Sequence, residues 1–310
     1  MNRRYLLLSL LLSSVLLAGD IGGYAGSFLR VGTTARSLAM GGGLTADLDS
    51  GFPAYYNPAA MAFLPKRHVS VFHHFLPLDR YLVSAAFSSA LPPSGGIGVG
   101  ILNAGVEGIQ GRDQAGHETG TFSTEEYAVY FSFANQLFRN ISFGVNVKLF
   151  YQVLPVDGRQ VSKGTGVDLA MLFRPARKFQ LGLVIQDWNA GYAWNTSEVF
   201  DEKGSSYQDE FPTQVRVGFA YHPKLFDIYG DYTFFSAGEN TTASRIRAGG
   251  EYRPMERVSV RAGMNNFSPT VGGGLNYSLI NRDDSYVDYA FLLGRRGEGV
   301  SHVFTYIFTF

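Results

Sequence analysis

Most of the chain consists of segments in which apolar and polar residues alternate. In the clearest segment, apolar residues occupy every second position from Ile141 to Tyr151, with Ser142, Asn146 and Lys148 among the residues between them. Successive side chains of an extended strand point to opposite faces, so this pattern predicts strands with one apolar and one polar face. We expect fourteen strands, at 67–76, 80–90, 95–106, 123–137, 140–153, 164–174, 178–188, 212–222, 225–236, 243–253, 256–266, 270–279, 285–294 and 300–310.

Strand length and number favour a membrane barrel over a soluble sandwich, although both bury one face of each strand. Most predicted strands approach the ~10 residues that cross a bilayer at a tilt, whereas soluble strands are typically about five or six residues long. The strand number is also even, which is usual for bacterial outer-membrane barrels. The predicted fold is therefore all-β, a transmembrane antiparallel β-barrel of about 14 strands formed by residues 67–310.

The connections between the predicted strands support the same interpretation. Short turns and long polar stretches alternate along the chain, as expected when turns collect on one rim of a barrel and loops on the other. The short turns lie at 91–94, 137–140, 174–178, 222–225 and 253–256, and the long polar stretches at 107–122, 154–163, 189–211 and 237–242.

The last strand ends on aromatic residues that alternate with Val, Thr and Ile. Phe304, Tyr306, Phe308 and Phe310 lie on one face of an extended strand, which is expected to face lipid. A terminal Phe after alternating aromatics resembles the signal that delivers bacterial outer-membrane proteins to the barrel-assembly machinery. The alternative is a buried edge strand of a soluble domain.

The first nineteen residues have the character of a secretory signal peptide. Arg3 and Arg4 precede an apolar run from Tyr5 to Leu17, and the small residues Ala18 and Gly19 follow. The run is shorter than the ~20 residues that a spanning helix needs. We therefore expect export from the cytoplasm and a location in the bacterial cell outer membrane, with outer-membrane lipid around the barrel.

Composition excludes several classes of function. The 26 basic residues balance the 26 acidic ones, which argues against a nucleic-acid partner. The chain has no cysteine, so disulfides and thiolate sites are excluded. The adjacent His73 and His74 fall on opposite faces of a strand and make a poor metal pair. With no catalytic signature, we expect no enzymatic activity, no catalytic or metal-binding residues and no cofactor.

Residues 20–66 do not alternate, and they carry two motifs that resemble known families. The stretches SFLRVG (27–32) and ARSLAMGG (35–42) resemble the N-terminal signature of the PorV/PorQ family of outer-membrane proteins. The stretch AYYNPAAMA (54–62) resembles the Asn-Pro-Ala segment that this family shares with FadL-type transporters of hydrophobic compounds. The resemblance implies that residues 20–66 fold into the lumen of a fourteen-stranded barrel as an N-terminal plug.

Within this plug segment, five residues are of interest. The resemblance places Asn57, Pro58 and Ala59 in the plug motif, and a simple turn before the first strand is the alternative role for Asn57. Arg30 and Arg36 are expected either to be solvated or to pair with lumenal carboxylates, for which the candidates are Asp168, Asp231 and Glu251. The basic residues Lys148, Arg216, Arg245, Arg247 and Arg261 are expected to form an ion-pair network with Asp168 and Glu251 that packs the plug.

Two functions follow from these resemblances. Resemblance to PorV/PorQ implies a part in type IX protein secretion, with secretion-system components and exported proteins as partners. Resemblance to FadL implies passive transport of a hydrophobic small molecule, which is released past the plug or through an opening in the wall. Four aromatic residues in or beside the long stretch 189–211 are the candidate surface for a partner or a ligand, namely Trp188, Tyr192, Trp194 and Phe200.

Overall fold

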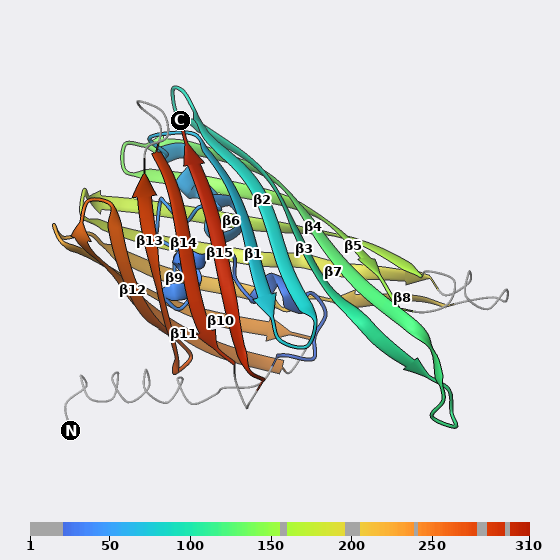
Figure 1. The fold of residues 1–310 in the computed structure, drawn as a ribbon. Helices are drawn as coiled ribbons and strands as arrows, with labels where there is room; N and C mark the ends of the chain where they lie inside the picture. The colour runs from blue at the N-terminus through green and yellow to red at the C-terminus, as the bar shows by residue number, and fades with distance from the viewer. Residues whose placement is uncertain (1–20, 156–159, 196–204, 239–240, 278–283, 295–297) are drawn as a thin grey trace, which may run out of the picture.

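The alternating segments form one antiparallel sheet of fifteen strands (Figure 1). The computed structural model describes residues 21–155, 160–195, 205–238, 241–277, 284–294 and 298–310. The signal peptide expected at 1–19 and Phe200 lie outside these residues. The strands are β1 (His68–Leu76), β2 (Arg80–Leu91), β3 (Gly95–Arg112), β4 (Glu118–Phe138), β5 (Ile141–Val153), β6 (Val161–Ala176), β7 (Phe179–Asn195), β8 (Ser206–Glu210), β9 (Thr213–Tyr221), β10 (Phe226–Ala237), β11 (Thr241–Met255), β12 (Val258–Asn265), β13 (Ser268–Tyr277), β14 (Asp284–Leu293) and β15 (Val300–Thr309).

The sheet closes into a barrel. The last strand, β15, pairs with β1 from the couple Thr309–His68 to the couple His302–Phe75. Both β8 and β9 pair with β7, over different parts of its length, so they share one position in the wall. The barrel thus has fourteen strand positions, which confirms the predicted fold class. Among the described residues, no helix is long and apolar enough to cross a membrane.

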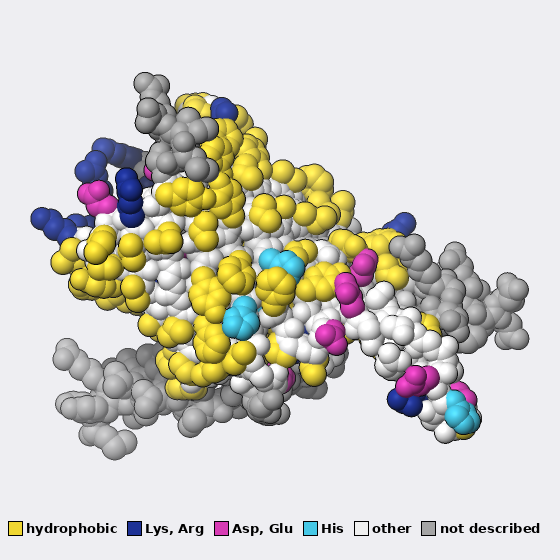
Figure 2. Space-filling model, in the orientation of Figure 1, with side chains coloured by type: hydrophobic (Ala, Val, Ile, Leu, Met, Phe, Trp, Pro, Cys, Tyr) yellow, Lys and Arg dark blue, Asp and Glu magenta, His cyan; other side chains and the backbone are white. Residues whose placement is uncertain are grey.

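The two faces of the wall differ as the alternation predicts. On β5, Phe143, Val145 and Val147 are exposed on the outside, whereas Asn146 and Lys148 are buried on the inside. Hydrophobic side chains cover much of the outer surface in the same way (Figure 2). A contiguous apolar exterior of this size is what a lipid-embedded barrel requires.

The C-terminal aromatics belong to this outer surface. Phe304, Tyr306 and Phe310 are 47 %, 37 % and 43 % exposed, and Phe308 stacks on Phe310 with ring centroids 5.5 Å apart. The opposite side chains of β15, among them Val303 and Thr305, are buried in the interior. These aromatics therefore face outward, and their role as an assembly signal stays a prediction.

Several stretches expected to be loops are strands instead. The stretch 107–122 continues β3 and β4 as a paired hairpin, and only residues 113–117 form its turn. Likewise, residues 189–195 belong to β7. The loop expected at 154–163 is shortened by β6, and the one expected at 237–242 by β10 and β11. The alternation fades there because both faces of these strand ends are polar, although backbone pairing continues. The strands β3 to β7 therefore extend well past their neighbours, towards the lower right of Figure 1.

Most of residues 21–64 are buried, and their short helices lie within the ring of strands (Figure 1). Four short helices, η2 (Ser27–Arg30), α2 (Ala35–Ala39), α3 (Pro53–Tyr56) and η3 (Pro58–Phe63), are joined by irregular backbone. We call residues 21–66 the lumenal segment. Irregular backbone at membrane depth is tolerated where protein surrounds it, as here.

Glycines on the inner face of the wall let the lumenal segment approach closely. A Cβ atom at Gly96 would lie 2.5 Å from the carbonyl carbon of Met61, and one at Gly98 would lie 2.6 Å from the Met61 sulfur. A Cβ atom at Gly144 would overlap the backbone of Pro58 and Ala59. These strand glycines are therefore required by the packing of the wall against the segment.

Candidate functional site

The Asn-Pro-Ala motif fastens the lumenal segment to the wall. Asn57 is fully buried, and its side-chain oxygen accepts a hydrogen bond from the Ala59 N–H at 3.0 Å, capping η3. Its amide nitrogen donates to the carbonyl oxygens of Thr45, at 2.8 Å, and of Met171 on β6, at 3.2 Å. On β5, Ser142 donates to the carbonyl oxygen of Ala59 at 2.8 Å. Asn57 is therefore both the cap of a turn and a link between the segment and the barrel.

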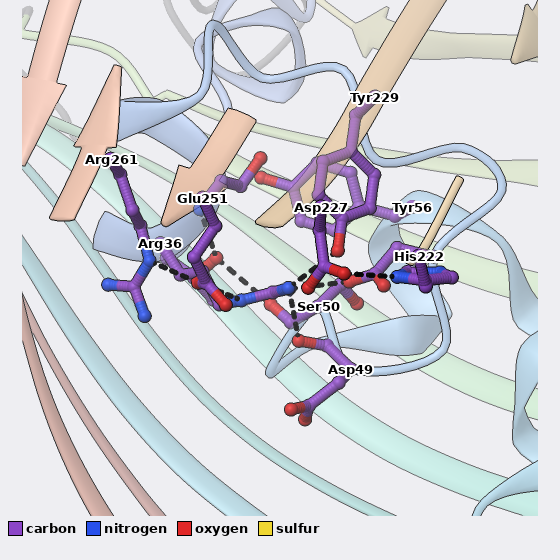
Figure 3. Close-up of polar contacts among 12 residues, drawn as sticks. Arg36, Asp49, Ser50, Tyr56, His222, Asp227, Tyr229, Glu251 and Arg261 are labelled. Atoms are coloured by element: carbon purple, nitrogen blue, oxygen red, sulfur yellow. Dashed lines mark hydrogen bonds and ion pairs between the residues drawn. The ribbon is translucent and has the colours of Figure 1, made fainter. Parts of the chain in front are cut away.

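Arg36 anchors the other half of the lumenal segment through charge (Figure 3). Its guanidinium group contacts Asp47 at 2.5 Å, Glu251 of β11 at 3.1 Å and the hydroxyl of Tyr229 at 2.8 Å. Arg261 of β12 approaches the same Glu251 oxygen at 2.5 Å. We call these five residues the Arg36 network. Because each charge is almost fully buried, removing one partner would leave another uncompensated.

The two arginines singled out in the sequence behave differently. Arg36 pairs with Glu251, as one of the predicted alternatives has it. Arg30 donates to carbonyl oxygens of its own segment, at 3.0 Å to Ala25 and 2.8 Å to Tyr24. Backbone carbonyls thus satisfy this buried guanidinium, and it fixes the fold at the start of the segment.

A second buried charge cluster lies on β5, β6, β7 and β9. Lys148 of β5 contacts Asp168 of β6 at 2.6 Å and also pairs with Asp187 of β7. Gln214 of β9 donates to Asp187 at 2.7 Å. Asn146 donates both to Asp168, at 2.8 Å, and to the carbonyl oxygen of Ala54 in the lumenal segment, at 2.6 Å. This Lys148 cluster joins four strands and the segment, and the pairing of Lys148 with Asp168 was expected from the sequence.

Next to the Lys148 cluster, the regular pairing of β7 is interrupted. The ladder between β7 and β9 ends at the couple Gln186–Gln214, and the ladder between β7 and β8 begins at the couple Gly191–Glu210. We call residues 187–190 of β7, with residues 211–212 opposite, the wall interruption. The described hydrogen bonds across it include those from the Phe211 N–H to the Ala190 carbonyl, at 2.9 Å, and from the Thr213 hydroxyl to the Asp187 carbonyl, at 3.4 Å. The bond from Gln214 to the Asp187 carboxylate, at 2.7 Å, also joins the two strands here.

The backbone of the wall interruption is unusual for a strand. Asp187 and Asn189 have positive φ angles of 59° and 51°, in the left-handed region that Asp and Asn tolerate better than most residues. The pairing with β6 also shifts here, from Thr165–Gly191 to Val167–Trp188 and then to Leu169–Ile185. At each shift β7 advances three residues while β6 advances two, so β7 contains two bulges. Asp168 accepts a hydrogen bond from the Asp187 N–H at 2.9 Å, so the Lys148 cluster holds the first unusual residue in place.

A cavity of about 430 Å³ opens at the wall interruption. Its lining comes from both faces of the wall, because Trp188 is 55 % exposed on the outside whereas Tyr192 and Phe211 are buried on the inside. Phe211 packs against Tyr192 and Phe150, with both ring-centroid distances equal to 4.9 Å. An aromatic cluster thus lies directly behind the interruption.

Of the four aromatic residues expected to form a loop surface, three are described and all lie on β7. Trp188 is on the outer face, Tyr192 is buried inside, and Trp194 packs partly buried against the core. The structure brings Trp188 and Tyr192 together at the cavity. Tyr192 and Trp194 were expected in the long stretch 189–211, so their location on a strand corrects the sequence-based expectation, whereas Trp188 belongs to the strand expected at 178–188.

The search for relatives finds likeness in structure alone. No family model matches the chain, and no curated protein sequence matches it. Among solved structures, the toluene transporter TodX of Pseudomonas putida superposes with a TM-score of 0.60 at 13 % identity, covering 90 % of this chain and 96 % of that one. The chain has the fold of the FadL-type channels.

Two further structures share the FadL-type fold. The monoaromatic hydrocarbon channel CymD gives a TM-score of 0.59 at 14 % identity, and a FadL homologue of Pseudomonas aeruginosa gives 0.59 at 10 % identity. Each match covers 90 % of this chain and 97 % of the other. At such low identity the likeness extends to the fold and not to individual residues.

The wall interruption is the feature that sequence reasoning missed. The stretch DWNAG (187–191) interrupts the alternation with Asp, Asn and Gly, the residue types that most readily adopt positive φ. That signal was present in the sequence. Its consequence for the wall depends on which residues β8 and β9 pair with, and the sequence of β7 does not contain this information.

Proposed function

We propose that the protein is a bacterial outer-membrane channel that admits small hydrophobic molecules passively and releases them sideways through the wall interruption. The observation that carries this proposal is the 430 Å³ cavity, which is lined from both faces of the wall. Its lining includes the polar residues Lys163, Gln208 and Glu210, and the aromatic residues Phe150, Tyr192 and Phe211 lie behind it. Buried residues of the lumenal segment between Phe28 and Leu64 pack against residues of the wall, which disfavours a straight aqueous path. A lateral exit avoids that obstacle.

The height of the wall interruption agrees with release into lipid. Short turns of outer-membrane barrels face the periplasm, and the short turns here include 139–140, 177–178 and 256–257. Residues 187–190 lie eight to eleven positions along β7 from its first residue, Phe179. At about 2.5 Å of height per tilted residue, the interruption lies roughly 20–28 Å above the turns, near the outer edge of an apolar band ~25 Å tall. A hydrophobic molecule leaving there enters the outer leaflet.

A large side chain introduced at the outer opening of the cavity tests whether hydrophobic molecules pass through the wall interruption. Thr213 lines the cavity, and its alternation with the buried Gln214 places it on the outer face of β9. We expect Thr213→Trp to slow the entry of an apolar fluorescent dye into vesicles carrying the protein several-fold. The matched control is Val217→Trp, on the same face of the same strand but outside the cavity lining, which is expected to transport normally. Equal rates for both variants and the wild type, or no advantage over protein-free vesicles, would refute the proposal.

A second function, in the secretion or surface attachment of exported proteins, is favoured by the β3–β4 hairpin. Its residues 107–122 project beyond the ends of β2 and β5 and are largely exposed (Figure 1). Its turn is ordered, because the backbone N–H groups of His117 and Ala115 donate to Asp113 and hold the pKa of that carboxyl below its usual value. Replacing 107–122 by a two-residue turn should abolish surface attachment of exported proteins while leaving dye entry unchanged. Unchanged attachment would exclude this role of the hairpin.

A further inference from the structure

A second cavity lies inside the barrel, away from the wall interruption. It measures about 130 Å³ and lies between the lumenal segment and the wall formed by β1 and β12 to β14. Val31 and Leu38 line it from the segment, and Leu292 and Leu293 line it from β14. Its wall residues lie at the rim that carries the turns 77–79 and 266–267, the end of the barrel opposite the turns 139–140, 177–178 and 256–257.

His74 of β1 gives this cavity a polar group in need of a partner. The side chain is only 1 % exposed and lines the cavity. Among the described residues, neither of its ring nitrogens has a hydrogen-bonding partner. A neutral imidazole carries one donor and one acceptor, and burying such a group unpaired destabilises the protein. A ligand that offers a hydrogen bond to His74 offsets part of that destabilisation.

The other polar groups of the cavity define what the ligand must be. The Thr270 hydroxyl is already engaged, donating to the Ala39 carbonyl at 2.9 Å and accepting from the Gly41 N–H at 3.1 Å. No Lys, Arg, Asp or Glu is among the described lining residues, so an ionised ligand would be buried without a counter-charge. Asn265 and Ser268 also line the cavity, beside the turn 266–267. The site therefore favours a neutral, mainly apolar molecule that carries a hydrogen-bonding group.

The volume sets the size of that molecule. A cavity of about 150 Å³ lined by apolar side chains accommodates benzene. This one measures about 130 Å³ and is open where Leu293 is 52 % exposed, so it is suited to a molecule with a single six-membered ring. We propose that the cavity is a binding site for neutral hydroxylated single-ring compounds of the phenol class, with the hydroxyl hydrogen-bonded to His74 and the ring between Leu38 and Leu292.

This site deepens the proposed function by naming a class of molecule, and it rests on residues that the lateral route does not use. The wall interruption belongs to β7 and β9, whereas His74 belongs to β1. The test below measures binding and not passage. Either proposal can therefore fail while the other stands.

Phenol and toluene are a matched pair of probes, since they differ by a hydroxyl in place of a methyl group. The full chain in detergent is titrated with each, and the ratio of the two affinities is compared between the wild type and His74→Phe. Loss of one hydrogen bond is expected to lower the preference for phenol about three- to tenfold, with toluene binding kept or improved. The matched control is His73→Phe, because His73 is the adjacent residue on the outer face and does not line the cavity.

A second measurement avoids mutation of the ligand-binding residue. In the wild type, with histidine labelled by ¹⁵N, phenol should shift one imidazole resonance, and Leu38→Trp should abolish that shift by filling the cavity. If His74→Phe leaves the ratio of affinities unchanged, or if phenol perturbs no histidine, the assignment is wrong. Dye entry through the wall interruption is expected to be unaffected by His74→Phe.

Discussion

Replacing Lys148 by Met tests whether the Lys148 cluster shapes the wall interruption. Lys148 is 1 % exposed and compensates Asp168 and Asp187, which are 0 % and 2 % exposed. The variant leaves two buried carboxylates facing each other without a cation, a change that costs about 3–5 kcal/mol. With an unfolding entropy of about 2.1 cal/mol/K per residue, the midpoint of thermal unfolding should fall by about 5–8 °C.

The same variant should also slow transport. The positive φ of Asp187 is a strained conformation, costing of order 1–3 kcal/mol, that persists only while its surroundings hold it. Without Lys148, the contacts that keep Asp187 in this conformation weaken. Regular pairing of β7 with β9 can then extend into the wall interruption, which would narrow the cavity. Entry of an apolar dye into vesicles is therefore expected to fall together with the unfolding temperature, which is read from the gel shift of heated samples.

Two comparisons make the Lys148 experiment decisive. The control variant Lys178→Met removes an exposed lysine from the turn between β6 and β7 and should change neither quantity. Adding Asp168→Asn and Asp187→Asn to Lys148→Met removes the uncompensated charges and should restore most of the stability. The reasoning is refuted if Lys148→Met behaves like Lys178→Met, or if the triple variant is no more stable than the single one.

Two further predictions concern the lumenal segment and the C-terminus. Asn57→Ala removes the cap of η3 and the bond to Met171, so it should lower the stability by about 1–2 kcal/mol and increase proteolysis within 21–66. The control Asn140→Ala, at a half-buried position in the turn 139–140, should do neither. Phe310→Ser should reduce the amount of barrel assembled in the outer membrane while leaving the stability of refolded protein nearly unchanged, because that ring is 43 % exposed. Normal assembly of Phe310→Ser would contradict the proposed role of the terminal aromatics.

The outer face of the barrel was predictable because lipid imposes a simple rule on it. Every second residue from Phe143 to Leu149 faces lipid and must be apolar, so the alternation is visible in the sequence itself. The hairpin at 107–122 was not predictable from alternation, because both of its faces are polar. Local sequence gives strand character there only weakly, and backbone pairing decides the structure.

The interior was predictable only in part. The sequence places His73 and His74 on opposite faces, and the structure confirms this. The cavity beside His74, however, is assembled from β1, β12, β13, β14 and the lumenal segment, which are far apart in the chain. Similarly, the pairing of Arg36 with Glu251 was one of several open possibilities, because nothing local to either residue selects its partner.

The enclosure of the lumenal segment has a consequence for the order of folding. The Ala35 N–H donates to the hydroxyl of Thr305 at 2.6 Å, across a sequence separation of 270 residues. A Cβ atom at Gly51 would lie 2.8 Å from Ile307, also on β15. Contacts at such separation make folding slow, because a very long loop must close before they form. We therefore expect the lumenal segment to be in place before β15 pairs with β1. If these two strands paired first, the closed barrel would exclude the segment.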